Sequence, residues 1–115
     1  MVKNIRAFSE SFPSAQAVNL PEMIQYGEDA VVSRTLAKGE SGTLTLFAFD
    51  VGQELSEHTA PFDAYIQVVD GDGMFTVGGE PVPASAGQSV LMPAGIPHAV
   101  LAVTRMKMIL FMLRK

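Results

Sequence analysis

From Ala30 onward the chain consists of short runs of strand-forming residues, each closed by a glycine, proline or aspartate turn. β-Branched and aromatic residues favour strands, and such punctuation favours tight turns between them. The predicted strands are residues 31–36, 43–50, 55–59, 64–70, 74–77, 80–83, 89–92, 98–103 and 107–113. Many short strands at near-regular spacing predict an all-β sandwich or barrel, in which closure removes exposed strand edges.

The beginning of the chain has a different character. Residues 1–29 are predicted to form an N-terminal arm with one short helix, and residues 30–115 to form the barrel. Asn19 and Glu22 stand at the spacing of a capping box, which predicts the start of that helix. Gly27 predicts its end. The length of 115 residues is that of one domain.

Charge and composition exclude several classes of protein. The net charge is −4 and the eight basic residues are scattered, which argues against nucleic-acid binding. No cysteine is present, so a disulfide, a thiolate nucleophile and a cysteine-bound zinc are excluded. The N-terminus lacks the apolar core of a signal peptide, and the longest apolar run, Met108–Leu113, is too short to cross a bilayer. We therefore expect a cytoplasmic protein with no nucleic-acid or membrane partner.

The last predicted strand is apolar on both faces. One face carries Ile109, Phe111 and Leu113, and the other carries Met108, Leu110 and Met112. A strand of this kind is usually buried on both sides. The barrel interior covers one face, and a second copy of the chain would cover the other, which predicts a homodimer. The alternative is that the N-terminal arm covers that face within one chain.

Each of the two histidines of the chain lies in a patterned segment. The residues whose spacing defines the pattern are Gly52, His58 and Gly71 in the first segment, and Gly87, Pro93, Gly95 and His98 in the second. In these spacings the chain resembles the cupin superfamily, over about residues 40–113. The resemblance implies a double-stranded β-helix, or jelly-roll barrel, with a pocket at one end. The chain resembles in particular the small single-domain cupins in which the metal-binding motif is degenerate.

The departures from the family pattern concern its metal ligands. The second histidine of the family corresponds to Ala60, its glutamate to Ala64, and its late asparagine lies near Ala102. The ligand set implied by the resemblance is thus reduced to His58 and His98. Catalytic zinc and iron sites usually have three or more protein ligands. The expected cofactor is therefore either none or a divalent Fe, Mn, Ni or Zn ion held by an incomplete set.

The predicted ligand-binding pocket contains His58, His98, Tyr65, Gln67 and Met108, with the histidines also as candidate metal ligands. In an apolar pocket a neutral imidazole suits a carboxylate, a carbonyl or an enol. A carboxylate near His58, either Glu57 or Asp63, could orient it, although adjacency on a strand puts Glu57 on the opposite face. No catalytic residue can be assigned from the sequence.

Three functions are compatible with these residues. The first is a barrel that binds a small molecule without catalysis. The second is a metal-dependent enzyme of the dioxygenase, isomerase or decarboxylase type that uses His58 and His98. The third is a metal-free acid–base enzyme with a histidine as base and Tyr65 as acid.

Overall fold

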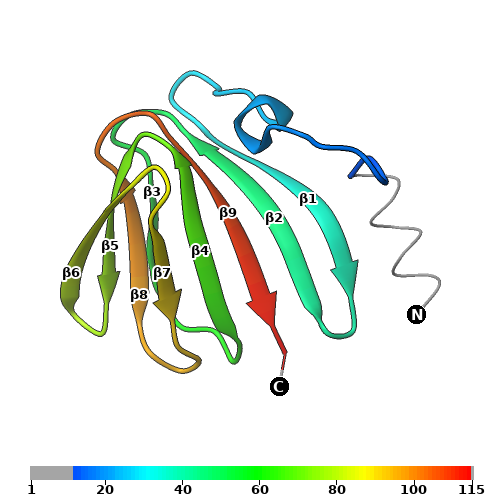
Figure 1. The fold of residues 1–115 in the computed structure, drawn as a ribbon. Coiled ribbons are helices and arrows are strands. Elements are labelled where there is room, and N and C mark those ends of the chain that lie inside the picture. Colours follow the sequence, from blue (N-terminus) through cyan, green and yellow to red (C-terminus); the bar gives the residue numbers. More distant parts are fainter. Residues whose placement is uncertain (1–11, 115) are drawn as a thin grey trace.

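The computed structural model describes residues 12–114 and arranges their strands in two sheets that face each other (Figure 1). One sheet has the order β1-β2-β9-β4-β7 and the other has the order β3-β8-β5-β6. The strands are β1 (Val31–Gly39), β2 (Gly42–Phe49), β3 (Glu54–His58), β4 (Asp63–Asp70), β5 (Asp72–Val77), β6 (Glu80–Ser85), β7 (Ser89–Met92), β8 (His98–Ala102) and β9 (Met106–Leu113). Neighbouring strands in both sheets run antiparallel. The all-β prediction and its strands are confirmed, with ends displaced by at most three residues.

The hairpin between β5 and β6 illustrates how local sequence sets the register. Val77 pairs with Glu80, so Gly78 and Gly79 alone form the turn. Both glycines have positive φ angles, 58° and 84°. A two-residue turn with two positive φ angles matches the right-handed twist of the strands that it joins.

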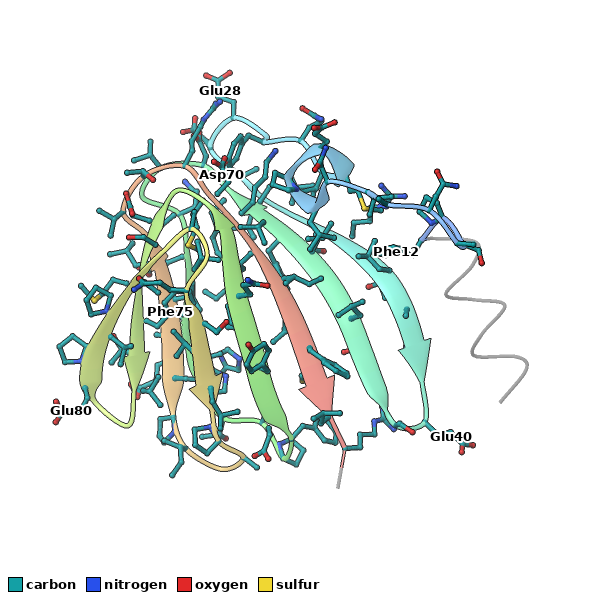
Figure 2. The ribbon with its side chains drawn as sticks, in the orientation of Figure 1. Phe12, Glu28, Glu40, Asp70, Phe75 and Glu80 are labelled. Atoms are coloured by element: carbon teal, nitrogen blue, oxygen red, sulfur yellow. The ribbon has the colours of Figure 1, made fainter. Side chains whose placement is uncertain are left out.

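The main core lies between the two sheets, where side chains from both fill the space (Figure 2). Alternation along each strand sends every second residue inward. Phe49 and Phe75 are the largest side chains of this core and have no exposed surface. The other buried members are Ala64, Ile66, Val68, Ala84, Val90, Met92, Val100, Ala102, Met106 and Met108.

A second core forms on the outer face of the five-stranded sheet, beneath the N-terminal segment. It contains Ile24, Leu36, Leu46 and Ala48 as buried residues. Lys107, which is buried, donates a hydrogen bond from Nζ to the carbonyl oxygen of Pro21 and thereby holds the segment on the sheet. The N-terminal segment therefore covers part of the outer face within one chain.

The N-terminal helix is shorter than its sequence pattern indicates. It is one 3-10 turn, η1 (Leu20–Met23), and Ile24 is already extended, so the predicted continuation up to Gly27 is wrong. The capping box is wrong as well: the Asn19 side chain bonds to the Glu22 carboxylate and caps no backbone amide. Burial of Ile24 on the sheet takes precedence over helix extension. Within residues 12–114 no helix has the length and apolar character needed to cross a membrane. The part of the arm predicted over residues 1–11 lies outside the described residues.

The rest of the outer face remains uncovered. Tyr65 on β4 pairs in register with Leu91 on β7 and with Phe111 on β9, which makes an apolar row across three strands. These side chains are between 42 % and 57 % exposed. Leu113 is exposed on the same face of β9. The expected burial of both faces of β9 is thus met only under the N-terminal segment, and the homodimer remains a prediction.

Candidate functional site

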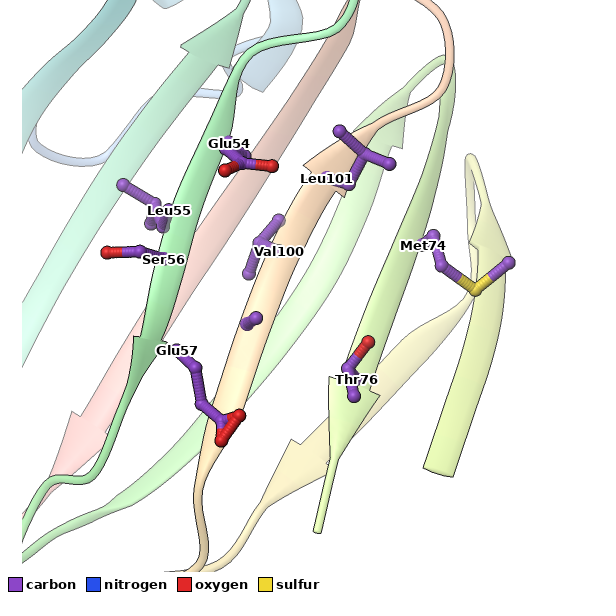
Figure 3. Close-up of a pocket in the computed structure, with 9 residues that line it drawn as sticks. Glu54, Leu55, Ser56, Glu57, Met74, Thr76, Val100 and Leu101 are labelled. Atoms are coloured by element: carbon purple, nitrogen blue, oxygen red, sulfur yellow. The ribbon is translucent and has the colours of Figure 1, made fainter. Parts of the chain in front are cut away.

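A bulge in β3 brings the two histidines together. His58 on β3 is the register partner of His98 on β8, and the register of this pair of strands shifts between Leu55 and His58. β3 advances three positions from Leu55 to His58 while β8 advances two from Val100 to His98, so β3 carries one extra residue. One extra residue reverses the usual alternation, and Leu55 and His58 therefore both face the interior. Glu57, between them, faces outward (Figure 3). The bulge is therefore the local feature that positions His58.

The imidazoles of His58 and His98 meet edge to face. Their Nε2 atoms are 3.2 Å apart, and their ring centroids are 4.4 Å apart at an interplanar angle of 70°. The Nδ1 atom of His58 lies 2.8 Å from the Ser56 carbonyl oxygen, and that of His98 lies 3.1 Å from the Ile96 carbonyl oxygen. A carbonyl oxygen only accepts, so each Nδ1 carries the hydrogen of its bond. In the neutral rings, each Nε2 then presents its unshared electron pair to the other.

The histidine pair borders a cavity between the sheets. The cavity has a volume of about 180 Å³. Its other lining residues are Leu55, Ala60, Ala64, Ile66, Met92, Val100, Met108, Leu110 and Met112. His98 is buried, whereas His58 is exposed and stands at the rim. Among the described residues, the two imidazoles are the only polar side chains that line this cavity.

A second hollow lies on the outer face of the four-stranded sheet. It has a volume of about 290 Å³ and is lined by Glu54, Glu57, Thr76 and Leu101 among others (Figure 3). It is larger but more open to solvent, and neither histidine reaches it. The enclosed cavity with the histidine pair is therefore the better candidate site.

The structure divides the predicted pocket residues into two groups. His58, His98 and Met108 line the same cavity. Tyr65 and Gln67 do not, because Ala64 and Ile66 face inward and their neighbours on β4 must face outward. The Tyr65 hydroxyl donates a hydrogen bond to Ser89 Oγ at 2.9 Å on the outer face.

The groups that orient the histidines are not side chains. The two carbonyl oxygens that accept from Nδ1 belong to the residue two positions before each histidine. Sequence reasoning missed them because every residue has a carbonyl group, and only the backbone path aims it. Glu57 faces away, and Asp63 accepts a hydrogen bond from the Ala94 amide at 2.9 Å.

Comparison with known proteins identifies the family to which this fold belongs. The family model described as a cupin domain matches residues 45–113. The chain belongs to the cupin family. This confirms the resemblance seen in the two patterned segments. No curated protein matches the chain.

Solved structures with the same fold include cupins from several bacteria. A conserved protein of unknown function from Streptococcus pyogenes is 32 % identical, with a TM-score of 0.86 over 91 % of this chain and 92 % of the other. A cupin 2 conserved barrel domain protein from Leptotrichia buccalis is 36 % identical, with a TM-score of 0.80 over 84 % of this chain and 47 % of that one. A cupin superfamily protein from Desulfitobacterium hafniense is 24 % identical, with a TM-score of 0.86 over 91 % and 96 %.

The divalent metals that cupin membership suggests do not fit the side chains of this cavity. In the described part of the chain, no three acidic or histidine side chains are grouped where they could hold a metal ion. Ala60 and Ala64 line the cavity beside the histidines and offer no donor atom. Zinc and iron favour three or more nitrogen and oxygen ligands from the protein. Two imidazoles alone do not supply such a set.

Proposed function

We propose that this cupin binds a compact weak acid in the cavity between its sheets and does not catalyse a reaction on it. The observation that carries the proposal is the pair of Nε2 atoms, 3.2 Å apart, that face each other at an apolar cavity. Two unshared electron pairs at this separation repel unless a proton or another electron acceptor lies between them. The pair therefore favours a ligand that brings its own proton.

The chemistry of the pair narrows the ligand class. A carboxylic acid or an enol can transfer its proton to one Nε2, and the carboxylate or enolate oxygen that is left then accepts a charge-assisted hydrogen bond from that N–H. A carbonyl compound without an acidic proton supplies only an acceptor, which leaves the repulsion in place. Of the carboxylate, carbonyl and enol groups suggested by the sequence, the geometry thus supports the enol and the carboxylate in its protonated form, because each carries an acidic proton.

The volume and the lining limit the rest of the ligand. A dry cavity of about 150 Å³ is known to hold benzene. A cavity of about 180 Å³ therefore suits a ligand of roughly six to ten non-hydrogen atoms. The methionine, leucine and isoleucine side chains around it favour an apolar body, and methionine adapts its shape to that body.

The enzymatic alternatives have weaker support. A metal-dependent enzyme using His58 and His98 needs further ligands that the wall does not offer. An acid–base enzyme with Tyr65 as acid needs that hydroxyl in the cavity, whereas it bonds to Ser89 on the opposite face of the sheet. The binding function requires neither.

Matched probe ligands and matched variants test the proposal. Benzoic acid and benzamide have the same size and shape, but only the acid carries an acidic proton. By isothermal titration calorimetry, we expect benzoic acid to bind at least tenfold more tightly than benzamide. His58→Gln should remove this preference, and Gln67→Ala, on the outer face, should leave it unchanged.

Three results would contradict the proposal. Equal affinity for acid and amide would show that the histidine pair does not select a proton donor. A preference retained in His58→Gln would assign it to another site. Conversion of the acid to a product, followed by NMR, would overturn the non-catalytic part.

A further inference from the structure

We infer that Arg114 holds a second acidic group of the ligand at the mouth of the cavity, so that the ligand class is a linear dicarboxylic acid. The inference rests on the proposed function, because the first acidic group is the one whose proton the histidine pair takes. Arg114 lies outside both patterned segments of the sequence.

The cavity lies at one end of the barrel. His58 ends β3 and His98 begins β8, while Ala64 is near the start of β4 and Met112 is near the end of β9. These strand ends gather at the end of the barrel where the C-terminus lies (Figure 1). A side chain that follows Met112 is therefore next to the mouth of the cavity.

Arg114 continues the inward face of β9. Met108, Leu110 and Met112 line the cavity at alternate positions, and Arg114 comes two residues later. The Arg114 amide donates a hydrogen bond to the Ser41 carbonyl oxygen at 2.9 Å, which extends the ladder between β2 and β9 by one residue. Alternation along this ladder directs the Arg114 side chain to the same side as that of Met112.

The guanidinium of Arg114 is held over the loop that joins the two sheets at this end. It lies 5.2 Å from the centre of the Phe62 ring, and Phe62 stands between Ala60 and Ala64, which both line the cavity. Among residues 12–114 the guanidinium forms no ion pair and no hydrogen bond, so its N–H donors are available to a ligand. The planar fork of a guanidinium matches the two oxygens of a carboxylate.

The distribution of charge makes Arg114 the cation of this site. Residues 39–104 contain no lysine or arginine, and they include every strand that lines the cavity except β9. Lys107 on β9 is buried on the outer face, where it bonds to Pro21. A carboxylate that leaves water needs a partner of opposite charge. In the described part of the chain, Arg114 is the residue placed to be that partner.

The two walls set the length of the ligand. The histidines belong to the four-stranded sheet and Arg114 follows a strand of the five-stranded sheet, so the acid-binding groups stand on opposite walls. A spherical cavity of about 180 Å³ would be about 7 Å across. An extended chain advances about 1.2 Å per bond, so adipic acid spans about 6 Å between its two carboxyl carbons. Its methylene groups then lie against the methionine and leucine side chains.

Adipic acid and its half-amide, adipamic acid, test the inference by isothermal titration calorimetry on the full chain. The two have the same length, but only adipic acid carries two acidic groups. We expect adipic acid to bind at least tenfold more tightly than adipamic acid, and at least tenfold more tightly than the shorter succinic acid. In the NMR spectrum, the Nε–H signal of Arg114 should shift more with adipic acid than with adipamic acid.

Variants assign the second acidic group to Arg114. Arg114→Gln should remove the preference for adipic acid over adipamic acid. Lys38→Gln is the matched control, because it removes the same charge from an exposed residue of β1, and it should retain the preference. Arg114→Lys keeps the charge but not the planar fork, so its affinity for adipic acid should be intermediate.

Several outcomes would overturn the inference. Equal affinities of the wild type for adipic and adipamic acid would do so, and this comparison needs no variant. A preference retained in Arg114→Gln would do so as well. An equal loss of benzoic acid and adipic acid affinity in Arg114→Gln would show that one carboxylate meets both Arg114 and the histidines, which contradicts a second group.

The comparison of benzoic acid with benzamide tests the proposed function separately, because benzoic acid has no second acidic group. A preference for benzoic acid together with equal binding of adipic and adipamic acid would contradict the inference alone. Equal binding within both pairs of ligands would contradict the inference and the proposed function together.

Discussion

Two glycines with the same backbone conformation allow a controlled test of how the turns hold the barrel. Gly71 and Gly95 both have a φ angle of 76°. Each forms one backbone hydrogen bond, from the Ala86 amide to the Gly71 carbonyl and from the Gly95 amide to the Ala60 carbonyl. Their surroundings differ. A Cβ atom on Gly71 would overlap the Arg105 carbonyl oxygen, whereas one on Gly95 would meet nothing within 4 Å.

The expected costs of substitution by alanine follow from this difference. A positive φ costs an L-residue roughly 1–2 kcal/mol, and the loss of glycine freedom in the unfolded chain returns about 0.4–1 kcal/mol. Gly95→Ala should therefore lower the free energy of unfolding by about 1 kcal/mol. Gly71→Ala adds a clash with backbone, and overpacking adds typically 1–3 kcal/mol. We expect a loss of about 3 kcal/mol for Gly71→Ala.

Urea unfolding followed by far-ultraviolet circular dichroism measures both variants, since the chain has no tryptophan. Comparable m-values would show that the unfolding transitions expose similar surface. In a thermal melt, a loss of 1 kcal/mol lowers the Tm of a domain near this size by about 4–8 °C. Gly71→Ala should then melt more than about 12 °C below the wild type. Losses within about 0.5 kcal/mol of each other would refute the role of the Arg105 carbonyl.

Three further predictions concern charge, metal and assembly. The bond from the Asp29 amide, followed by that from Arg105, holds the pKa of Asp50 below its usual range. The stabilisation by ionised Asp50 is therefore present above about pH 4 and is lost as the pH falls through the lowered pKa. In Asp50→Asn, the free energy of unfolding should therefore fall less steeply as the pH is lowered below about 4 than it does in the wild type. The double variant Ala60→His/Ala64→Glu should gain Zn²⁺ binding by calorimetry and be stabilised by the ion, and failure of both would contradict the assignment of those positions. The wild type should sediment as a dimer and Phe111→Arg as a monomer, whereas a monomeric wild type would remove the homodimer.

Much of the fold could be predicted because its signals are local. The Gly78-Gly79 turn determines the register of its hairpin through the φ angles of two residues. Alternation along β4 points the side chains of Ala64 and Ile66 inward and those of the residues next to them outward. The extent of η1 could not be predicted, because burial of Ile24 on the sheet decides where the helix ends, and the sheet is formed by residues distant in sequence.

The sequence by itself determined the all-β barrel, the family and the two histidines, because turn chemistry and motif spacing are carried by neighbouring residues. Only the tertiary structure decided how those histidines meet and what surrounds them. The bulge between Leu55 and His58 changes which residues face inward, so alternation alone does not locate His58. The two Nδ1 partners are backbone carbonyls, which no side-chain pattern reveals. A site built from strand register and carbonyl direction depends on the paths of β3 and β8 together, and these exist only once the sheets have formed.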